Sequence, residues 1–302
     1  MAAASVLPAS TTGTVALWGG TKDGKDGYID YAARTSNLND PAEVTITAQD
    51  VRYLQPQPCY AENGYQLVHH PSQLKVEDFL ASDTEEGKKL IQDVYFEECR
   101  SLVQKTTNAA VAIPVSFRIR QDSGSGNNKM TETHKSQVKT KGLSVAPRPI
   151  PHVDRDPTTA VVVLKDTVGE EKAEELLKKY EHWAQVNVWR PIENVAKRWP
   201  LMFMNHDQIP DWSYEKYLGR VYSLNDPRKS LRGDISYDCM VKDDSRYIYH
   251  YASNMTPDEV WVFSSFDSDP KKAHPHGAFW DLNTPADAPL RRSIEMRTLV
   301  FW

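Results

Sequence analysis

The last third of the chain most constrains the fold, because it consists of short strand-like segments separated by turn clusters. Five segments follow one another: DISYDCMV, RYIYHYAS, DEVWVFSSF, AHPHGAFWDL and RRSIEMRTLVFW. Clusters of turn-forming residues, such as LNDPRK, MTPD and DSDPKK, lie before or between them. Several short strands at such spacing predict a β-sandwich or a β-barrel.

The preceding part of the chain mixes strands with helices. Strand character is found in residues 41–54 and 109–121 and in QVNVWRPI after residue 184, whereas a helical period runs through 75–107 and 169–184. We therefore expect a β-rich α+β protein in which N-terminal and flanking helices pack outside the sheets.

A chain of 302 residues is long enough for one large domain or two ordinary ones. Residues 1–15 are small and polar, so we expect them to be disordered and residues 16–302 to form a single domain. Within this domain, a polar segment rich in Gly, Ser and Lys at about 122–148 predicts a mobile loop. Strand-like sequence resumes directly after it, which argues against a domain boundary there.

Composition excludes several classes of partner. The net charge of -5 and the pI near 6.0 give no basic surface for nucleic acid or an anionic membrane. The three cysteines contain no CxxC pair, which fits a reducing compartment and argues against a thiolate metal site. The N-terminus lacks the features of a secretory signal. We expect a cytoplasmic protein, monomeric or homodimeric, that acts on a small molecule.

A metal site is suggested by HVD, which places His152 and Asp154 two positions apart. The spacing alone is weak, because about one His-x-Asp or His-x-Glu is expected by chance in a chain of this composition. A third ligand must come from elsewhere, and AHPHGAFWD offers His274 or His276. Two imidazoles and one carboxylate on one face of Fe(II) leave positions open for a bidentate co-substrate and for O2.

Arg291 and Ser293 are candidates for binding that co-substrate. On a strand they share one face, so both side chains can contact a single ligand. An arginine binds a carboxylate of 2-oxoglutarate as a bidentate ion pair, and a serine hydroxyl adds a hydrogen bond. Arg297 lies on the same face and is a rival for the role.

Two polar residues of VNVWRPI are further candidates. Asn187 is placed to hydrogen-bond the metal-proximal carboxylate of the co-substrate, and Arg190 to bind a substrate carboxylate or a 2-oxoglutarate oxygen. The pairs His69–His70 and His206–Asp207 look metal-like but are expected to be structural. The loops at 122–148 and 206–234 are the expected determinants of substrate choice.

At the level of whole blocks, the sequence resembles a known enzyme family. From about residue 40 to the C-terminus, the blocks GYQLVHHPS, HVD, VNVWRPI, TPDEVWVFSSFDS, HGAFWD and RRSIEMRTLVFW are similar to the mostly fungal gibberellin-desaturase-like hydroxylase/desaturase proteins. That family includes the cephamycin 7α-methoxylation protein. The resemblance implies a double-stranded β-helix (jelly-roll) core and a non-haem oxygenase that depends on Fe(II), 2-oxoglutarate and O2.

The resemblance also implies roles for particular residues. It favours His152, Asp154 and His276 as the iron ligands, because the family's ligand lies directly before the small-Ala-Phe segment. It implies Arg291 and Ser293 as the co-substrate clamp. Arg292 stands where the family usually has an acidic residue, which makes Arg292 a second rival for the role. The expected reaction is hydroxylation, desaturation or oxidative cyclisation at an unactivated C–H of a secondary metabolite or an amino-acid-derived compound. The alternatives are an inactive β-helix binding protein and a cupin-like metalloenzyme without 2-oxoglutarate.

Overall fold

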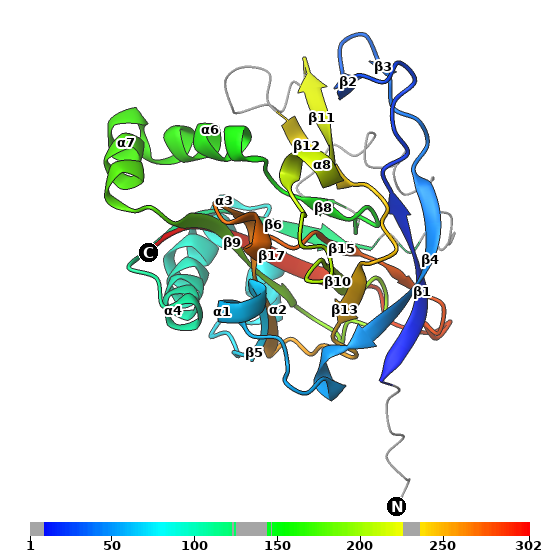
Figure 1. The fold of residues 1–302 in the computed structure, drawn as a ribbon. Helices are drawn as coiled ribbons and strands as arrows, with labels where there is room; N and C mark the ends of the chain where they lie inside the picture. Colours follow the sequence, from blue (N-terminus) through cyan, green and yellow to red (C-terminus); the bar gives the residue numbers. More distant parts are fainter. Residues whose placement is uncertain (1–8, 123, 125–143, 146, 226–235) are drawn as a thin grey trace, which may run out of the picture.

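Two β-sheets form the centre of the molecule (Figure 1). The computed structural model describes residues 9–122, 124, 144–145, 147–225 and 236–302. One hydrophobic core contains residues from both sheets, so the sheets pack against each other. This arrangement is the predicted β-rich jelly-roll core with N-terminal and flanking helices, which is confirmed.

The larger sheet has eleven strands, and its neighbours are antiparallel except for the pairs β13–β4 and β11–β2. In spatial order its strands are β16 (Trp280–Asp281), β1 (Ser10–Leu17), β4 (Ala42–Asp50), β13 (Ile248–Tyr251), β10 (Leu201–Asn205), β15 (His276–Ala278), β8 (His152–Val153), β12 (Ser236–Val241), β11 (Leu218–Leu224), β2 (Gly27–Asp30) and β3 (Thr35–Ser36).

The smaller sheet has six strands, all antiparallel to their neighbours except β7 beside β6. In spatial order its strands are β5 (Tyr65–His69), β14 (Glu259–Asp267), β9 (Trp183–Pro191), β17 (Arg292–Phe301), β6 (Val111–Gln121) and β7 (Ser144–Val145). The strands β14, β9 and β17 lie in its interior, and every residue of β9 is buried.

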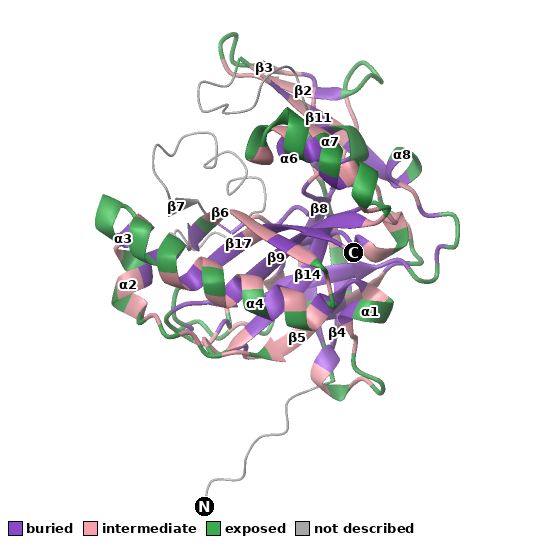
Figure 2. Ribbon diagram, turned by 90° about the vertical axis from the view of Figure 1, so that its left-hand side faces the viewer, coloured by how far each residue is buried: buried purple, intermediate pink, exposed green. Residues whose placement is uncertain are grey.

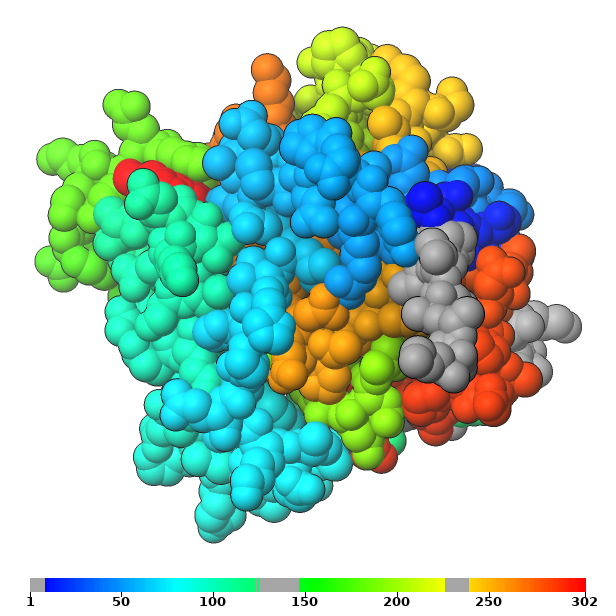
Figure 3. All heavy atoms as spheres, turned by 90° about the horizontal axis from the view of Figure 1, so that it is seen from below, coloured from blue at the N-terminus to red at the C-terminus, as the bar shows by residue number. Residues whose placement is uncertain are grey.

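The helices lie outside the sheets, with exposed outer faces (Figure 2). They are η1 (Val51–Tyr53), α1 (Tyr60–Asn63), α2 (Val76–Leu80), α3 (Glu85–Leu90), η2 (Ile91–Tyr95, a π-helical turn), α4 (Phe96–Thr107), α6 (Pro157–Val168), α7 (Glu170–Lys179), α8 (Tyr214–Tyr217) and η3 (Pro270–Lys272). The light-blue and cyan part of the chain, from η1 to α4, forms much of the surface seen from below (Figure 3). No helix among the described residues has both the length and the apolar character needed to cross a membrane.

Alternation along β9 gives the smaller sheet two different faces. Val186 and Val188 point toward α4 and share a hydrophobic cluster with its Leu102 and Val103. The residues between them, such as Asn187, therefore point to the opposite face, between the sheets. A single strand thus contributes both to the helical layer and to the interior of the jelly roll.

The structure confirms the expected strands at 41–54 and 109–121 and the expected helices within 75–107 and 169–184. No element was predicted at 157–168, which forms α6 because the Asp156 side chain accepts the Thr159 N–H as N-cap and Pro157 occupies the first turn. One expectation is wrong. Disorder was expected through residue 15, but Ser10–Leu17 forms β1 and pairs with β4 along its length. The expected loop at 122–148 lies mostly outside the described residues.

Candidate active site

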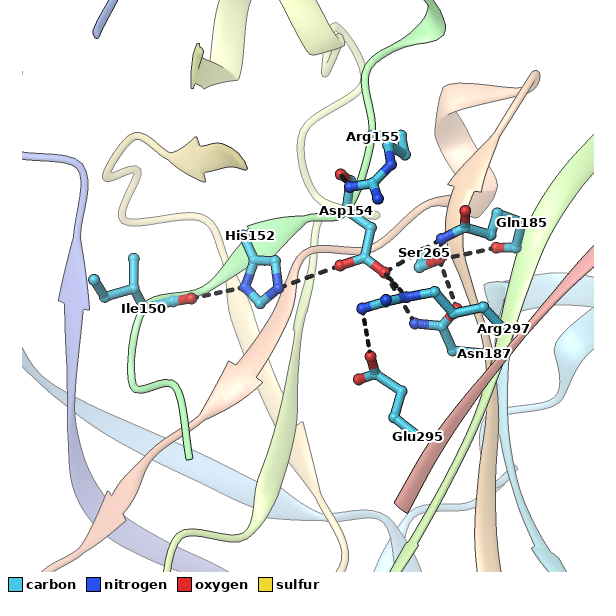
Figure 4. Close-up of polar contacts among 9 residues, drawn as sticks. All are labelled: Ile150, His152, Asp154, Arg155, Gln185, Asn187, Ser265, Glu295 and Arg297. Atoms are coloured by element: carbon cyan, nitrogen blue, oxygen red, sulfur yellow. Dashed lines mark hydrogen bonds and ion pairs between the residues drawn. The ribbon is translucent and has the colours of Figure 1, made fainter. Parts of the chain in front are cut away.

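A buried His–Asp–His group lies where β8 and β15 pair. His152 begins β8, Asp154 follows it, and His276 begins β15 directly opposite His152. All three side chains are buried, and each offers a ligand atom within 4.8 Å of those of the others. His152 Nε2 is 3.4 Å from Asp154 Oδ1 (Figure 4). The structure thus brings His276, and not His274, next to the HVD motif.

The His152 ring has a defined tautomer. Its Nδ1 is 2.8 Å from the carbonyl oxygen of Ile150 (Figure 4). A carbonyl oxygen only accepts, so Nδ1 carries a proton, and Nε2 is the ring nitrogen that faces Asp154 and is available to a metal ion. Protein ligands of metals commonly have this second contact, which orients the ring and raises its basicity.

The His276 ring is unusual because neither nitrogen has a hydrogen-bond partner among the described residues, although both are buried. The ring lies 4.5 Å from that of Phe263 and 6.4 Å from that of Phe203, measured between centroids. Burial, with a further effect of His152, lowers the pKa of His276 to about 4. The ring is therefore neutral near pH 7. A buried polar atom without a partner needs an explanation, and a bound metal ion would supply one for this ring.

The Asp154 carboxylate is held by its Oδ2 atom, which leaves its Oδ1 atom on the side of His152. Its Oδ2 accepts from Asn187 Nδ2 at 3.1 Å, from Gln185 Nε2 at 3.3 Å and from Arg297 Nε at 3.3 Å (Figure 4). Burial by itself would raise the pKa of Asp154, but Arg297 and the contact with His152 outweigh it and hold the pKa well below its usual value. The carboxylate is therefore charged and fixed in orientation.

A polar layer behind Asp154 was only partly predicted from the sequence. Asn187 was expected to contact the co-substrate, but here its amide donates to Asp154 and its oxygen accepts from Ser265 Oγ at 2.9 Å. Ser265 also accepts from Gln185 Nε2 at 2.9 Å. Gln185 and Ser265 were missed. The two-residue period of a strand would have found Gln185, which shares a face with Asn187.

Arg291 and Ser293 lie together, buried, at the start of β17. Ser293 Oγ and Arg291 Nε have no hydrogen-bond partner among the described residues. The guanidinium is 5.4 Å from the centroid of the Trp189 ring, and its Nη1 donates to the Trp199 carbonyl. Burial lowers the pKa of Arg291 to about 9. A buried cation whose Nε has no partner among the described residues, beside a hydroxyl in the same state, fits an anionic ligand.

The rival arginines have other partners. Arg292 Nη1 donates to Glu193 Oε2 at 2.9 Å on the outer side of β17. Arg297 is engaged by Asp154 and by Glu295, whose Oε1 lies 2.7 Å from Arg297 Nη2.

Arg190 lies on the opposite face of β9 from Asn187, as strand alternation requires. Its Nη2 donates to the His70 carbonyl, and its guanidinium is 5.8 Å from the centroid of the Tyr95 ring, against the helical layer. Nothing in its surroundings supports the expected contact with substrate or co-substrate.

A second group of metal-ligating residue types consists of His206, Asp207 and His274. The two imidazoles are stacked, with centroids 4.1 Å apart and an angle of 24° between their planes.

A jelly roll that buries a His–Asp–His group defines the class: a β-rich protein with the ligand set of a mononuclear metal site. The model of the oxidoreductase/YMDC permease-like domain family matches residues 21–301, and the chain belongs to this family. Oxidoreductase R1 of Phoma sp. is 51% identical, over 99% of this chain and 100% of the relative.

More distant relatives carry more specific names. The hydroxylase/desaturase efuI of Hormonema carpetanum is 28% identical, over 85% of this chain and 83% of the relative, which confirms the resemblance to the fungal hydroxylase/desaturase proteins. A solved structure of the iron and alpha-ketoglutarate-dependent endoperoxidase NvfI has a TM-score of 0.77 at 21% identity, and covers 98% of this chain and 99% of its own. That likeness shows that the fold is shared over the whole chain.

Proposed function

We propose that this protein is a non-haem oxygenase that depends on Fe(II) and 2-oxoglutarate and hydroxylates, desaturates or oxidatively cyclises a small molecule at an unactivated C–H. The observation that carries the proposal is the buried His276 ring, whose nitrogens lack partners among the described residues, beside His152 Nε2 and Asp154 Oδ1. The names of efuI and NvfI support the same chemistry.

The iron would be held by His152, Asp154 and His276. Two neutral imidazoles and one carboxylate suit Fe(II) and leave positions open for other ligands. The pKa of His276, lowered to about 4 by burial, fits this role because the ring does not have to lose a proton near pH 7. When bound, iron would allow O2 to oxidise both 2-oxoglutarate and the substrate.

The far carboxylate of 2-oxoglutarate would be bound by Arg291 and Ser293. Their unpartnered Nε and Oγ atoms are the donors that such a carboxylate requires. The Trp189 ring under the guanidinium fixes the plane in which those donors point.

The rest of the site would act by orientation and by exclusion of water. The Ile150 carbonyl keeps a proton of His152 on Nδ1. Arg297 and Asn187 donate to Asp154 Oδ2 and so fix the orientation of its carboxylate. The apolar ring of Phe263 covers one side of His276. A dry, preorganised ligand set limits side reactions of the bound reactants.

We further propose that the substrate is a secondary metabolite or an amino-acid-derived compound and that the enzyme acts in the cytoplasm as a monomer or homodimer. The three cysteines are all free thiols, as expected in a reducing compartment.

An anaerobic titration of the purified protein with Fe(II), then with 2-oxoglutarate, tests the proposal. The wild type should develop the weak visible charge-transfer band of the chelate, and Asp154→Ala should not, while circular dichroism shows that both are folded. Iron binding without the band would mean that the Arg291 clamp is wrong and would point to a metalloenzyme without 2-oxoglutarate. Absence of both would contradict the oxygenase proposal.

A further inference from the structure

Arg118 lies in the middle of β6, one strand away from the proposed co-substrate clamp. Its backbone pairs with that of Glu295 on β17. Directly opposed residues of an antiparallel pair have their side chains on the same face. Glu295 binds Arg297, which binds Asp154, so that face is the one that carries the proposed site. The Arg118 side chain is therefore directed to the side of the sheet where the chemistry would occur.

Arg118 has no hydrogen bond or ion pair with any residue of the described ranges, and its side chain is exposed. The charged form of Arg118 is destabilised by its surroundings. The positive charge of Arg297 has the largest effect, followed by burial and by Arg120, and together they lower the pKa of Arg118 to about 9. The side chain is thus accessible to solvent and lies near two other cations, Arg297 and Arg120. A guanidinium held there against another cation is stabilised if an anion enters.

The charges of the proposed site, with Fe(II) and 2-oxoglutarate bound, can be compared with those of the side chains around it. Fe(II) and the 2-oxoglutarate dianion balance each other. The carboxylates of Asp154 and Glu295 balance the guanidinium groups of Arg297 and Arg291. Arg118 adds a positive charge to this set, beside those of Arg297 and Arg120, and it is exposed whereas Arg120 and Arg291 are buried.

The strand order separates Arg118 from the clamp. β17 lies between β9 and β6, so Asn187 and Arg297 flank the proposed iron ligands while Arg118 lies one strand further out. Adjacent strands are about 4.8 Å apart, which an arginine side chain spans easily. A group bound by Arg118 would thus lie beside the reacting centre and not on the iron.

We propose that Arg118 binds a carboxylate of the substrate, and that the substrate is therefore an organic acid whose acid group is held away from the C–H that reacts. This inference rests on the proposed function, because it takes the iron and 2-oxoglutarate positions from it. The same guanidinium chemistry would suit a co-substrate carboxylate, so the test must separate the two sources.

The experiment uses the folded protein loaded with Fe(II) and 2-oxoglutarate under anaerobic conditions. The probes are matched pairs of a carboxylate and its primary amide: benzoate and benzamide, cinnamate and cinnamamide, decanoate and decanamide. Binding is measured by the change in the charge-transfer band and by the shift in melting temperature. The proteins are the wild type, Arg118→Gln, Arg118→Lys and, as a control for net charge, Arg100→Gln on the exposed face of α4.

We expect the wild type and Arg100→Gln to bind at least one carboxylate about tenfold or more tightly than its amide. Arg118→Gln should weaken carboxylate binding about ten- to hundredfold, as expected for the loss of a charged hydrogen-bond partner. Its affinity for 2-oxoglutarate should stay within about twofold of the wild-type value. Arg118→Lys should keep part of the preference because it keeps the charge.

Three results would overturn the proposal: equal binding of carboxylates and amides by the wild type, the same loss of preference in Arg100→Gln, or weaker binding of 2-oxoglutarate by Arg118→Gln. The last would make Arg118 part of the co-substrate clamp. Failure of the proposed function is a different result, since the wild type would then show no charge-transfer band at all.

Discussion

The described part of the chain contains two groups of one Asp and two His, and they differ in how the rings face each other. The first comprises His152, Asp154 and His276, and the second His206, Asp207 and His274. In the first, the ring centroids are 4.8 Å apart with an angle of 43° between the planes. In the second they are 4.1 Å apart and closer to parallel, at 24°.

The second group is packed as a stack. Trp212 lies on the other side of His206, with centroids 4.2 Å apart and an angle of 8°. His206 Nε2 is 3.2 Å from the Ala273 carbonyl, so it carries a proton, and the His206 backbone N–H points to His274 Nδ1 at 3.4 Å. His274 Nε2 is 3.9 Å from Asp207 Oδ1, a carboxylate that is half exposed.

The residue types of a metal site are therefore not sufficient to form one, because the lone pairs of the rings must also point to a common position. In the first group, the pairing of β8 with β15 places two rings opposite each other, and a carbonyl fixes one tautomer. In the second, stacking uses the ring faces, and near-parallel rings do not aim both lone pairs at one point. We therefore propose metal binding for the first group and a packing role for the second.

The largest expected effect is the loss of activity on removal of the carboxylate of the first group. Asp154→Ala should reduce 2-oxoglutarate turnover, measured as succinate formation, by more than about a hundredfold, since even the residues that support a metal ligand are worth ten- to hundredfold. Asp207→Ala is the matched change in the second group and should leave turnover and the binding of one Fe(II) per chain intact. A strong loss in Asp207→Ala would break the distinction.

The residues that hold each carboxylate give a second, smaller contrast. Asn187→Leu removes a donor to Asp154 and should weaken Fe(II) binding about ten- to hundredfold. Asn205→Leu removes the corresponding donor to Asp207, which lies at 2.8 Å, and should not change Fe(II) affinity. Anaerobic Fe(II) titrations of the two variants test this. Equal losses would indicate that the variants perturb the fold and not the ligand.

For folding stability, unlike activity, substitution in the second group should have the larger effect. His206→Ala removes the central ring of the stack and should lower the free energy of unfolding by about 2 kcal/mol. His276→Ala should abolish Fe(II) binding but cost less stability in metal-free protein, because it also removes two buried nitrogens without partners. Urea unfolding of both variants without metal checks the order, and a larger loss for His276→Ala would contradict it.

The smallest predicted effect is a loss of stability at acidic pH. His250 Nδ1 and the Tyr65 hydroxyl form a hydrogen bond of 2.7 Å, and the Tyr65 ring packs edge-on against His274. Burial lowers the pKa of His250 from 6.5 to about 4. The unfolded chain binds this proton more tightly, so the stability that neutral His250 contributes is complete above pH 6.5 and is lost as the pH falls toward 4. Between pH 7 and 5.5 the loss is about 1 kcal/mol.

His250→Gln keeps an amide for Tyr65 but removes the titration. Its free energy of unfolding in urea should therefore fall less steeply between pH 7 and 5.5 than that of the wild type, by about 1 kcal/mol. Identical slopes for the two proteins would show that His250 is not the group responsible.

The sequence by itself predicted the strand-rich last third, the helices within 75–107 and 169–184, and the candidate ligands His152, Asp154 and His276. These features are local or periodic: a two-residue alternation, a helical period, a conspicuous HVD spacing and block resemblance to a family. The sequence also indicated that Arg291 and Ser293 share one face, because that depends only on the geometry of a single strand. Helix α6 was not predicted, although its N-cap and the proline in its first turn are also local signals, and they outweigh its β-branched residues.

Only the tertiary structure decided which residues meet. Family resemblance favoured His276 over His274, but its position opposite His152 depends on the pairing of β15 with β8. The roles of Asn187 and Arg190 depend on which face of β9 looks between the sheets. The partners of Asp154 come from β9 and β17, far from it along the chain. Hydrogen-bond partners and ring orientations are set by contacts between distant segments. No spacing within one segment encodes them, and they alone separate a metal ligand set from a stack of the same residues.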